Sequence, residues 1–248
     1  MKSRQSSLQT SPPCPKCDGN GVFLADCPQL PEYHGQPVLC DCAAGLKLRR
    51  ERAAKLRAIS QLPPRMAAYT FESYAALRLS DTQRRAVEIA ATYARSGSLG
   101  ERHGLFLFGP VGTGKSGLAA AISNAAMNAG ISTIYKTAPD LMDYIRSSFK
   151  ADNDVSYDKI LDQIQRVELL VLDDLGTENL TAWVVEKLFQ IVDFRYRHDM
   201  RLIVTSNCAP DVLMERFERA GEQTGQRIVD RIMEMCALVE VSGGNLRG

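Results

Sequence analysis

Residues 104–120 read GLFLFGPVGTGKSGLAA. A short apolar run ends in a glycine-rich turn, and the turn leads through Lys115 and Ser116 into an alanine-rich segment that favours a helix. The turn matches the pattern G-x-x-x-x-G-K-S, with Gly109, Gly114, Lys115 and Ser116 in its fixed places. This pattern indicates a loop that wraps a phosphate chain, so we predict that the core of the protein binds a nucleoside triphosphate.

The residue types in this turn fit that chemistry. Backbone N–H groups that converge on phosphate oxygens leave little room for Cβ atoms, which explains the glycines. The helix that follows adds N–H groups and the positive end of its dipole, Lys115 can reach the β- and γ-phosphates, and the Ser116 hydroxyl can bind Mg²⁺. The predicted nucleotide-binding residues are Gly109, Pro110, Val111, Gly112, Thr113, Gly114, Lys115, Ser116 and Gly117. An ordinary glycine turn before a helix is disfavoured, because strand, loop and helix follow in the required order.

The composition is that of a soluble globular protein: of 248 residues, 45% are apolar and 24% are charged. This length allows one domain of ordinary size and a small one. The formal net charge of +1 excludes a global attraction to nucleic acid or membrane, so a nucleic-acid surface has to be a local patch. No apolar stretch approaches the roughly 20 residues that span a bilayer, and the N-terminus does not resemble a signal peptide. We therefore expect a cytoplasmic protein with reduced cysteines.

Cysteines are concentrated near the N-terminus, in a segment too short and loop-rich to build an apolar core. The predicted zinc ligands are two pairs, Cys14 and Cys17, and Cys40 and Cys42. A tetrahedral Zn²⁺ held by four thiolates would supply the missing folding energy. The second pair is closer in sequence than the usual C-x-x-C, so Cys27 and His34 are alternative ligands. Redox chemistry at the first pair has little support, because no thioredoxin-like strand and helix surround it.

The chain divides into three predicted regions. Residues 1–12 form a disordered tail, residues 13–60 a zinc module with a basic helix, and residues 61–248 the nucleotide-binding domain. The basic helix, at 46–59, is either a solvated linker or a contact for a partner or nucleic acid. Leu62-Pro63-Pro64 interrupts it, because proline cannot continue a helix.

In the third region, strands alternate with helices, which predicts a parallel sheet covered on both faces. A helix at 82–96 precedes the glycine turn. Strands are predicted at 131–137, 167–176, 201–207 and 237–241, and helices at 138–150, 156–165, 181–198, 209–217 and 225–236. The run at 167–176, VELLVLDDLG, is a continuous apolar stretch that ends in two carboxylates, as expected of a buried central strand whose tip faces a ligand.

These two carboxylates are candidates for the hydrolytic chemistry. A Mg²⁺–triphosphate needs an acidic residue near the metal, and hydrolysis needs a base that orients water, so we assign Asp173 to the metal and Asp174 to the water. Asn207 ends an adjacent predicted strand, where its amide could hold the γ-phosphate or the water, with Thr205 or Ser206 assisting. A solvated pair of aspartates at a strand end is the simpler alternative.

Two arginines one helical turn apart, Arg227 and Arg231, lie on one face of a predicted helix. An arginine presented to the γ-phosphate of a neighbouring subunit would make hydrolysis depend on assembly. Taken alone, the two residues are more simply a surface pair.

Taken together and in order, several segments resemble the AAA+ ATPases of the DnaC/DnaI helicase-loader and IstB transposition-helper group. They are GPVGTGKS, LLVLDDLGTE, the helix with W, F and YR, IVTSN, RIVDRI and the terminal GGNLRG. The resemblance covers roughly 69–247. It implies an ASCE-type sheet without a full helical lid, a Walker A loop at 109–116, a Walker B pair at Asp173 and Asp174, and sensor 1 at Asn207. It also implies that Arg231, with Arg227 beside it, is the arginine finger and that Arg247 is at the sensor 2 position.

The resemblance further implies that single-stranded DNA lies along the helix at 140–150. The candidate DNA-binding residues are Tyr144, Arg146, Phe149, Lys150, Thr181 and Trp183. The arginine and lysine could pair with phosphates, and the tyrosine or phenylalanine could stack on a base. The competing explanation for the two aromatic residues is a buried stripe of the core.

The expected function is that of an ATPase, with ATP, Mg²⁺ and Zn²⁺ as cofactors, that loads a hexameric replicative helicase during replication initiation. Loaders of this group carry an N-terminal zinc-bearing domain that grips the helicase, and the cysteine module here has a similar place in the chain. The main alternative is an IstB-like ATPase that assembles on duplex DNA and engages a transposase. A small-molecule kinase and a non-catalytic adaptor are two further alternatives. The first would need an arginine-rich lid and an acceptor pocket, which the sequence does not indicate.

Overall fold

The computed structural model describes residues 14–26, 28, 34–148, 156–177 and 180–246, and these form two compact units that divide between Ala54 and Lys55. The predicted tail at 1–12 lies outside the described residues, and the predicted domain limit at residue 60 stays a prediction. The basic helix is helix α1, Ala43–Ser60, and it runs across the division between the units.

The first unit is built on a short antiparallel pair of strands. Strands β1, Val22–Leu24, and β2, Pro37–Leu39, pair so that Val22 faces Leu39. The first cysteine pair precedes β1, and the second follows β2 directly. An antiparallel pair brings the start of one strand beside the end of the other, so the two cysteine pairs are brought to the same end of the hairpin.

The second unit contains a five-stranded sheet in the order β4-β5-β6-β3-β7. All four strand pairs are parallel. In chain order the strands are β3, Gly104–Phe108; β4, Thr133–Thr137; β5, Leu169–Asp173; β6, Arg201–Ser206; and β7, Cys236–Glu240. Because every strand runs the same way, the carboxyl ends of all five meet at one edge, which is where ligands bind in sheets of this kind.

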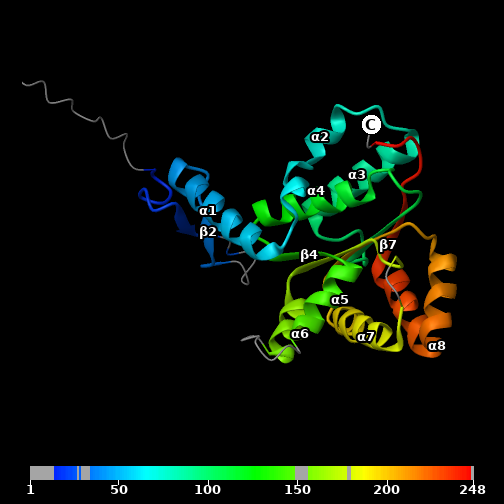
Figure 1. Ribbon diagram of the computed structural model, residues 1–248. Helices are drawn as coiled ribbons and strands as arrows, with labels where there is room; N and C mark the ends of the chain where they lie inside the picture. Colours follow the sequence, from blue (N-terminus) through cyan, green and yellow to red (C-terminus); the bar gives the residue numbers. More distant parts are fainter. Residues whose placement is uncertain (1–13, 27, 29–33, 149–155, 178–179, 247–248) are drawn as a thin grey trace, which may run out of the picture. The chain divides into compact units, whose positions relative to one another are not determined.

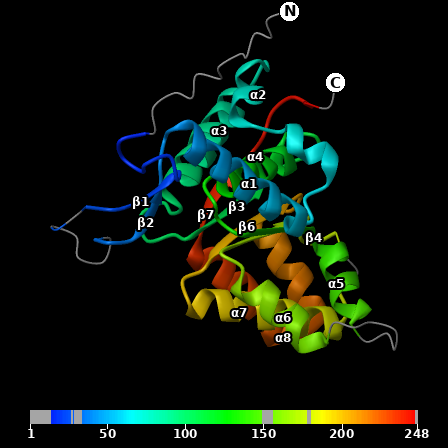
Figure 2. The same ribbon diagram turned by 90° about the vertical axis from the view of Figure 1, so that its left-hand side faces the viewer.

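Helices cover both faces of this sheet, as Figure 1 and the turned view in Figure 2 show. Leu105 and Leu107 pack with α3 and α4 on one face, whereas Phe106 packs with α5 to α8 on the other, as the alternation of a strand requires. The helices of this unit are η1, Pro64–Ala68; α2, Phe71–Ala75; α3, Asp81–Ser96; α4, Lys115–Asn128; α5, Ala138–Ser147; α6, Tyr157–Arg166; α7, Ala182–Arg197; and α8, Pro210–Met235. The predicted parallel α/β sheet is thus confirmed. Among the described residues, none of the helices is long and apolar enough to cross a membrane.

Helix α8 differs from the prediction of two separate helices at 209–217 and 225–236. It is one continuous helical element that is sharply bent, and Figure 1 shows its two limbs. A Cβ atom built on Gly225 would lie 2.1 Å from the carbonyl oxygen of Phe217, although eight residues of straight helix would separate the two by about 12 Å. The bend is possible because Gly225 has no side chain.

Candidate functional site

The glycine turn connects β3 to α4 at the carboxyl edge of the sheet. Residues 109–114, the phosphate loop, are followed directly by Lys115 as the first residue of α4. The Lys115 ammonium folds back and donates to the carbonyl oxygens of Gly109 and Pro110, both at 2.7 Å. Gly109 has φ of 143°, which favours glycine. A Cβ there would also lie 2.3 Å from the carbonyl oxygen of Val241, so the position excludes a side chain for steric reasons as well.

The amino end of α4 has the properties of an anion site. Its N-cap residue, Gly114, has no side chain that could accept from the first N–H groups of the helix. The neighbouring hydroxyl of Thr113 donates instead to the carbonyl oxygen of Pro110, at 2.9 Å. The amides at the start of α4 and the positive end of its dipole therefore face the loop without an intervening cap, as phosphate binding requires.

Asp173 ends β5 and connects three strands with α4. Its carboxylate accepts from the Thr205 hydroxyl at 2.6 Å and from the Tyr135 hydroxyl at 2.7 Å, and the side chain is buried. Burial and then the charge of Asp173 raise the pKa of Tyr135, so this phenol stays protonated and donates. The same phenol lies 3.4 Å from the carbonyl oxygen of Ser116 on α4. Asp173 is thus held within reach of the first turn of the phosphate-loop helix.

Asp174 follows in an unusual backbone conformation. Its φ is 61°, which short polar residues tolerate better than others. Its N–H donates to the Thr205 hydroxyl at 2.9 Å, and its carboxylate accepts from the Asn207 amide at 3.0 Å. The Thr205 hydroxyl therefore connects both aspartates, and the turned backbone places the second carboxylate against Asn207.

These residues form a phosphate loop beside an acidic strand end on a parallel sheet, and a family comparison agrees with that geometry. Residues 43–248 match the family model described as IstB-like ATP binding protein. The chain belongs to this family. Membership of the IstB-like family shows that ATP is the nucleotide to which its fold and loop are suited.

The chain is similar to two replication proteins. It is 27% identical over 154 residues to the replicative helicase loader DnaI of Bacillus subtilis, which covers 60% of this chain and 49% of DnaI. A solved structure described as that of DnaI superposes with a TM-score of 0.62 and 26% identity, over 75% of this chain and 95% of that one. A replication initiator DnaA bound to AMPPCP and single-stranded DNA gives a TM-score of 0.59 and 26% identity, over 74% of this chain and 52% of that one. The chain spans about half the length of the curated relatives it matches.

The two arginines of α8 lie against α7 of the same chain. The Arg231 guanidinium pairs with Asp193 at 2.6 Å and lies over the rings of Phe189 and Tyr196, with centroid distances of 4.8 and 5.5 Å. Arg227 lies over the same Phe189 ring at 5.1 Å. Arg231 is only 17% exposed, so presenting it to a neighbouring subunit requires the pair with Asp193 to open.

Two of the DNA-binding candidates are brought together. The Arg146 guanidinium lies 4.8 Å from the centre of the Trp183 ring, and it also pairs with Asp143 at 3.1 Å. Both candidates are at least partly exposed, so a cation and an indole face share one surface between α5 and the start of α7.

The other DNA-binding candidates have different environments. Tyr144 is partly buried; its hydroxyl lies 3.4 Å from the Gln163 side-chain oxygen, and Lys136 lies over its ring at 4.9 Å. Thr181 caps α7 by accepting from the Val184 N–H at 3.3 Å. Phe149, Lys150 and the sensor 2 candidate Arg247 lie outside the described residues.

The four predicted zinc ligands form a compact group of thiols. All four sulfur atoms lie within 4.8 Å of one another, with Sγ–Sγ distances of 3.7 Å between Cys14 and Cys40 and 3.5 Å between Cys17 and Cys42. Zinc–sulfur bonds of about 2.3 Å in a tetrahedron put sulfur atoms about 3.8 Å apart, so this donor set fits the metal. The residues could therefore hold Zn²⁺.

The electrostatics of this group are uneven. Backbone N–H groups at the start of α1, first that of Gly45, lower the pKa of Cys42 to about 7, whereas burial raises the pKa of Cys17 to about 11. Among the two alternative ligands, Cys27 lies outside the described residues, and His34 pairs with Asp26 at 3.8 Å. The described metal-binding group is made of the four cysteines.

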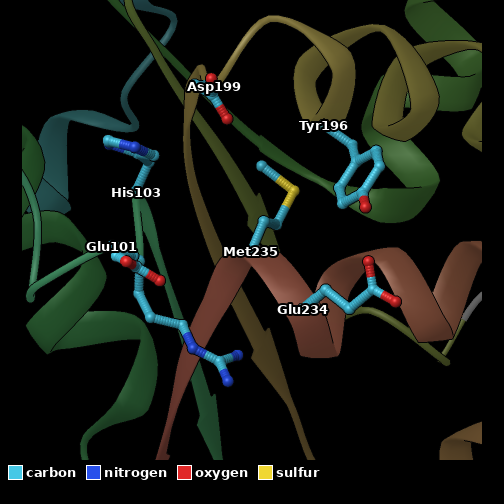
Figure 3. A pocket seen from close by; sticks show the side chains of 7 residues that line it. Glu101, His103, Tyr196, Asp199, Glu234 and Met235 are labelled. Carbon is cyan, nitrogen blue, oxygen red and sulfur yellow. The ribbon is translucent and has the colours of Figure 1, made fainter.

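A cavity of about 250 Å³ lies elsewhere, at the amino ends of the strands. Figure 3 shows Tyr196 of α7 and Glu234 of α8 on one side of it, with His103 and Asp199, which precede β3 and β6, on the other. This edge is opposite the phosphate loop, so the cavity is not part of the nucleotide site.

Sequence reasoning missed the residues that hold the site together from a distance. Tyr135, Tyr74 and Gln83 each bond to the acidic strand or to the phosphate loop. The one available signal was a tyrosine inside the apolar strand at 131–137, because a buried hydroxyl needs a partner. The other two residues are on segments that carry no nucleotide-binding pattern.

Proposed function

We propose that this chain binds ATP with Mg²⁺ at the carboxyl edge of its sheet and hydrolyses it. The observation that carries the proposal is the Tyr135 hydroxyl, which joins the Asp173 carboxylate to the first turn of α4. Because of this connection, the loop that would hold the phosphates and the acid that would face the metal belong to one site. The loop residues 109–114 would surround the phosphates, with Lys115, Ser116 and Gly117 continuing the site into α4.

Hydroxyl and carboxylate oxygens are the ligand types that Mg²⁺ prefers, and Ser116 with Asp173 would supply one of each. When bound, the metal would neutralise charge on the β- and γ-phosphates. The Asp173 carboxylate retains acceptor capacity beyond its two hydrogen bonds, because a carboxylate offers about four lone-pair sites.

The Asp174 carboxylate would orient water for attack on the γ-phosphorus. The bond to the leaving ADP oxygen breaks as the new oxygen–phosphorus bond forms, and Asp174 receives or relays the proton of the water. Asn207, held 3.0 Å from this carboxylate, would fix its direction and the position of the γ-phosphate.

The test compares nucleotide binding and turnover in the full-length chain and two variants. We expect Lys115→Ala to lose ATP binding, and Asp174→Asn to retain binding while hydrolysis falls by about a hundredfold or more. The second variant also separates an ATPase from a non-catalytic adaptor. Undiminished nucleotide binding by Lys115→Ala would overturn the site, and undiminished hydrolysis by Asp174→Asn would overturn its role.

We further propose that the ATPase loads a replicative helicase, with the N-terminal module as the part that contacts it. The alignment with a replicative helicase loader over 60% of this chain supports this role, as does a separate cysteine-bearing unit. The family description favours a second candidate, an IstB-like ATPase that assembles on duplex DNA and regulates a transposase. Capture experiments with purified helicase and purified transposase distinguish the two. The helicase-loader role predicts that the full chain captures the helicase and that Cys17→Ser, which disturbs the N-terminal module, does not.

Single-stranded DNA is the proposed nucleic-acid ligand. A DnaA of similar fold is bound to AMPPCP and single-stranded DNA, and here Arg146 over Trp183 offers a cation beside an aromatic face. The arginine would pair with phosphate and the indole would stack on a base. Binding of labelled single strands and duplexes by the chain and by Trp183→Ala tests the proposal; stronger duplex binding would favour the IstB-like role.

Zinc and self-association complete the proposal. The cysteine group would hold one Zn²⁺, which metal analysis of the purified chain would detect at one equivalent. Arg231 would serve as the arginine finger for a neighbouring copy, after exchanging Asp193 for a γ-phosphate. Turnover per molecule that rises with protein concentration in the native chain but not in Arg231→Ala would support assembly. The same concentration dependence in both proteins would oppose the role of Arg231.

A further inference from the structure

Three consecutive carbonyl groups of the phosphate loop are each held from outside the loop. The donors are on α2, on α3 and after β7, and each lies 30 or more residues from its acceptor in the sequence. The pairs are the Leu246 N–H on Gly112 at 2.8 Å, the Gln83 side-chain amide on Thr113 at 3.1 Å, and the Tyr74 hydroxyl on Gly114 at 2.8 Å. No single local motif produces this arrangement.

Holding these carbonyl groups sets the direction of the loop's donors. In a trans peptide, the C=O of one residue and the N–H of the next point in opposite directions. The described peptide bonds are trans, so fixing the carbonyls of residues 112–114 on the outside turns the N–H groups of Thr113, Gly114 and Lys115 away from those partners. These are the amides that a phosphate chain in the loop would meet.

Gln83 is the centre of this arrangement. It is 2% exposed, its side-chain oxygen accepts from the Ser80 N–H at 3.0 Å, and its NH₂ donates to Thr113 and also to the Gly244 carbonyl oxygen at 2.9 Å. The contact with Ser80 belongs to an ordinary capping box at the start of α3. The two donated bonds are not needed for capping, and they join the phosphate loop to the chain that follows β7.

That following segment, residues 242–246, forms a strap beside the loop; Figure 1 shows it in red, leading from β7 past α3. The strap is held at several points. The Ser80 hydroxyl donates to the Ser242 carbonyl oxygen at 2.7 Å, and a Cβ on Gly243 would lie 2.4 Å from that hydroxyl. A Cβ on Gly112 would lie 2.5 Å from the Asn245 side-chain oxygen, so strap and loop are in close contact.

We propose that Gln83 and the strap are positioning elements for the nucleotide: they hold the phosphate-loop carbonyls so that its amides face the phosphates. The inference rests on the proposed function, because it assigns a role toward a nucleotide in the same site. Gln83 acts through the loop backbone and the strap, and loosening either of them lowers nucleotide affinity.

The first test uses Gln83→Glu in the full-length chain, with a fluorescent ATP analogue and Mg²⁺. The carboxylate still accepts from Ser80 and so preserves the cap, but it cannot donate to Thr113 or Gly244. We expect affinity to fall by about tenfold at pH 8. The variant should recover part of this loss, relative to the native chain, as the pH falls and the carboxyl gains a proton that it can donate.

Two variants control for this result. Gln83→Leu has no titrating group, so its loss should not change with pH. Gln165→Glu makes the same chemical change at a side chain that donates to the Gln190 carbonyl oxygen, away from the loop, and its affinity should equal that of the native chain. Native affinity in Gln83→Glu would reduce the residue to a helix cap, and a loss that does not change with pH would not depend on the donated bonds; either result would overturn its positioning role.

The second test addresses the strap. In Gly243→Ala the new Cβ would press on Ser80 and Gln83, so we expect the strap to shift and affinity to fall by about tenfold. Gly100→Ala is the matched control, since Gly100 also has positive φ, 61°, but no atom lies within 4 Å of its Cβ position. Equal affinity of the two variants would overturn the role of the strap.

The outcomes distinguish this inference from the proposed function. If the native chain does not bind the analogue, or Lys115→Ala binds it equally well, the proposed function fails. If the native chain binds, Lys115→Ala does not, and Gln83→Glu and Gly243→Ala bind as the native chain does, only the positioning role fails. Thermal unfolding confirms that each variant is folded, and if the Gln83 variants are not, the comparison of Gly243→Ala with Gly100→Ala decides.

Discussion

A single hydroxyl, that of Thr205, connects the two aspartates of the candidate site. It donates to the Asp173 carboxylate and accepts from the Asp174 N–H. One side chain thus fixes both the acid assigned to the metal and the backbone turn that aims the acid assigned to water. Thr205 is fully buried, so neither bond can be replaced by bulk water.

We predict that Thr205→Val lowers ATP hydrolysis by about tenfold or more and destabilises the fold by about 1–3 kcal/mol, because the methyl group that replaces the hydroxyl leaves a buried N–H and a carboxylate each short of a partner. ATP affinity should change less than turnover, since the bonds described for this hydroxyl are to Asp173 and Asp174. Turnover, binding and urea unfolding measure the three effects. Thr133→Val is the control: that buried hydroxyl donates to the Ile131 carbonyl oxygen, and its loss should leave turnover unchanged.

At the scale of elements, a buried arginine joins two helices and a strand. Arg195 of α7 is fully buried and donates to the carbonyl oxygens of Ile164, Gln165 and Val167, at 3.3, 3.0 and 2.9 Å. Burial lowers its pKa to about 9, since no carboxylate offsets the desolvation. The guanidinium is therefore a cap for the end of α6, whose last carbonyls lack partners within the helix.

We predict that Arg195→Lys destabilises the fold by about 3 kcal/mol, because a lysine ammonium cannot reach carbonyls that the planar guanidinium spans. Urea unfolding of the full chain measures the change. The exposed Arg197→Lys, on the same helix and paired with Asp193 at 2.7 Å, should change stability by about 0.5 kcal/mol or less. Equal losses in both variants would show that the cap is unimportant.

The bend of α8 determines whether an alanine at Gly225 raises or lowers the stability of the fold. In a straight helix, glycine to alanine stabilises by about 1 kcal/mol. At Gly225 the added Cβ would meet the Phe217 carbonyl oxygen, so we expect Gly225→Ala to destabilise by about 2 kcal/mol. The free energy of unfolding of Gly225→Ala shows whether the variant is stabilised or destabilised. A stabilised variant would mean that the two limbs of α8 are not held against each other.

The features that the sequence could predict are those specified by residues close together in the chain. The phosphate loop and the acidic strand end were predictable because each is specified within about ten residues. Gln83 and Tyr135 were not, since their partners Thr113 and Asp173 lie 30 and 38 residues away and only the folded sheet brings them together. The two limbs of α8 were predicted as separate helices, at 209–217 and 225–236, and the local pattern does not reveal that the helix continues between them.

At the scale of the whole molecule, the two compact units have different sources of stability. The second unit has an apolar core on both faces of its sheet, whereas the described part of the first offers one short strand pair and the thiol group. Small units of this kind are commonly stabilised by a structural metal, by disulfides or by oligomerisation, and the thiol group favours the metal.

We predict that a strong zinc chelator unfolds the first unit and leaves nucleotide binding by the second intact. Limited proteolysis should then cut before residue 55 and spare the remainder, with mass spectrometry identifying the fragment. Cys17→Ser should show the same cleavage without chelator, and Cys208→Ser, outside the thiol group, should resist it. Protection of the first unit in the presence of chelator would contradict a structural metal.

The order of the strands has a consequence for synthesis on the ribosome. Strand β3 carries the phosphate loop, yet its two neighbours in the sheet, β6 and β7, follow it by about a hundred residues or more of chain. Until β6 emerges, this apolar strand has no partner on either side, and non-local pairing of this kind is slow to form. A nascent chain arrested before residue 200 should therefore hold an exposed β3 for a chaperone to cover and capture no nucleotide, although its glycine turn is already complete.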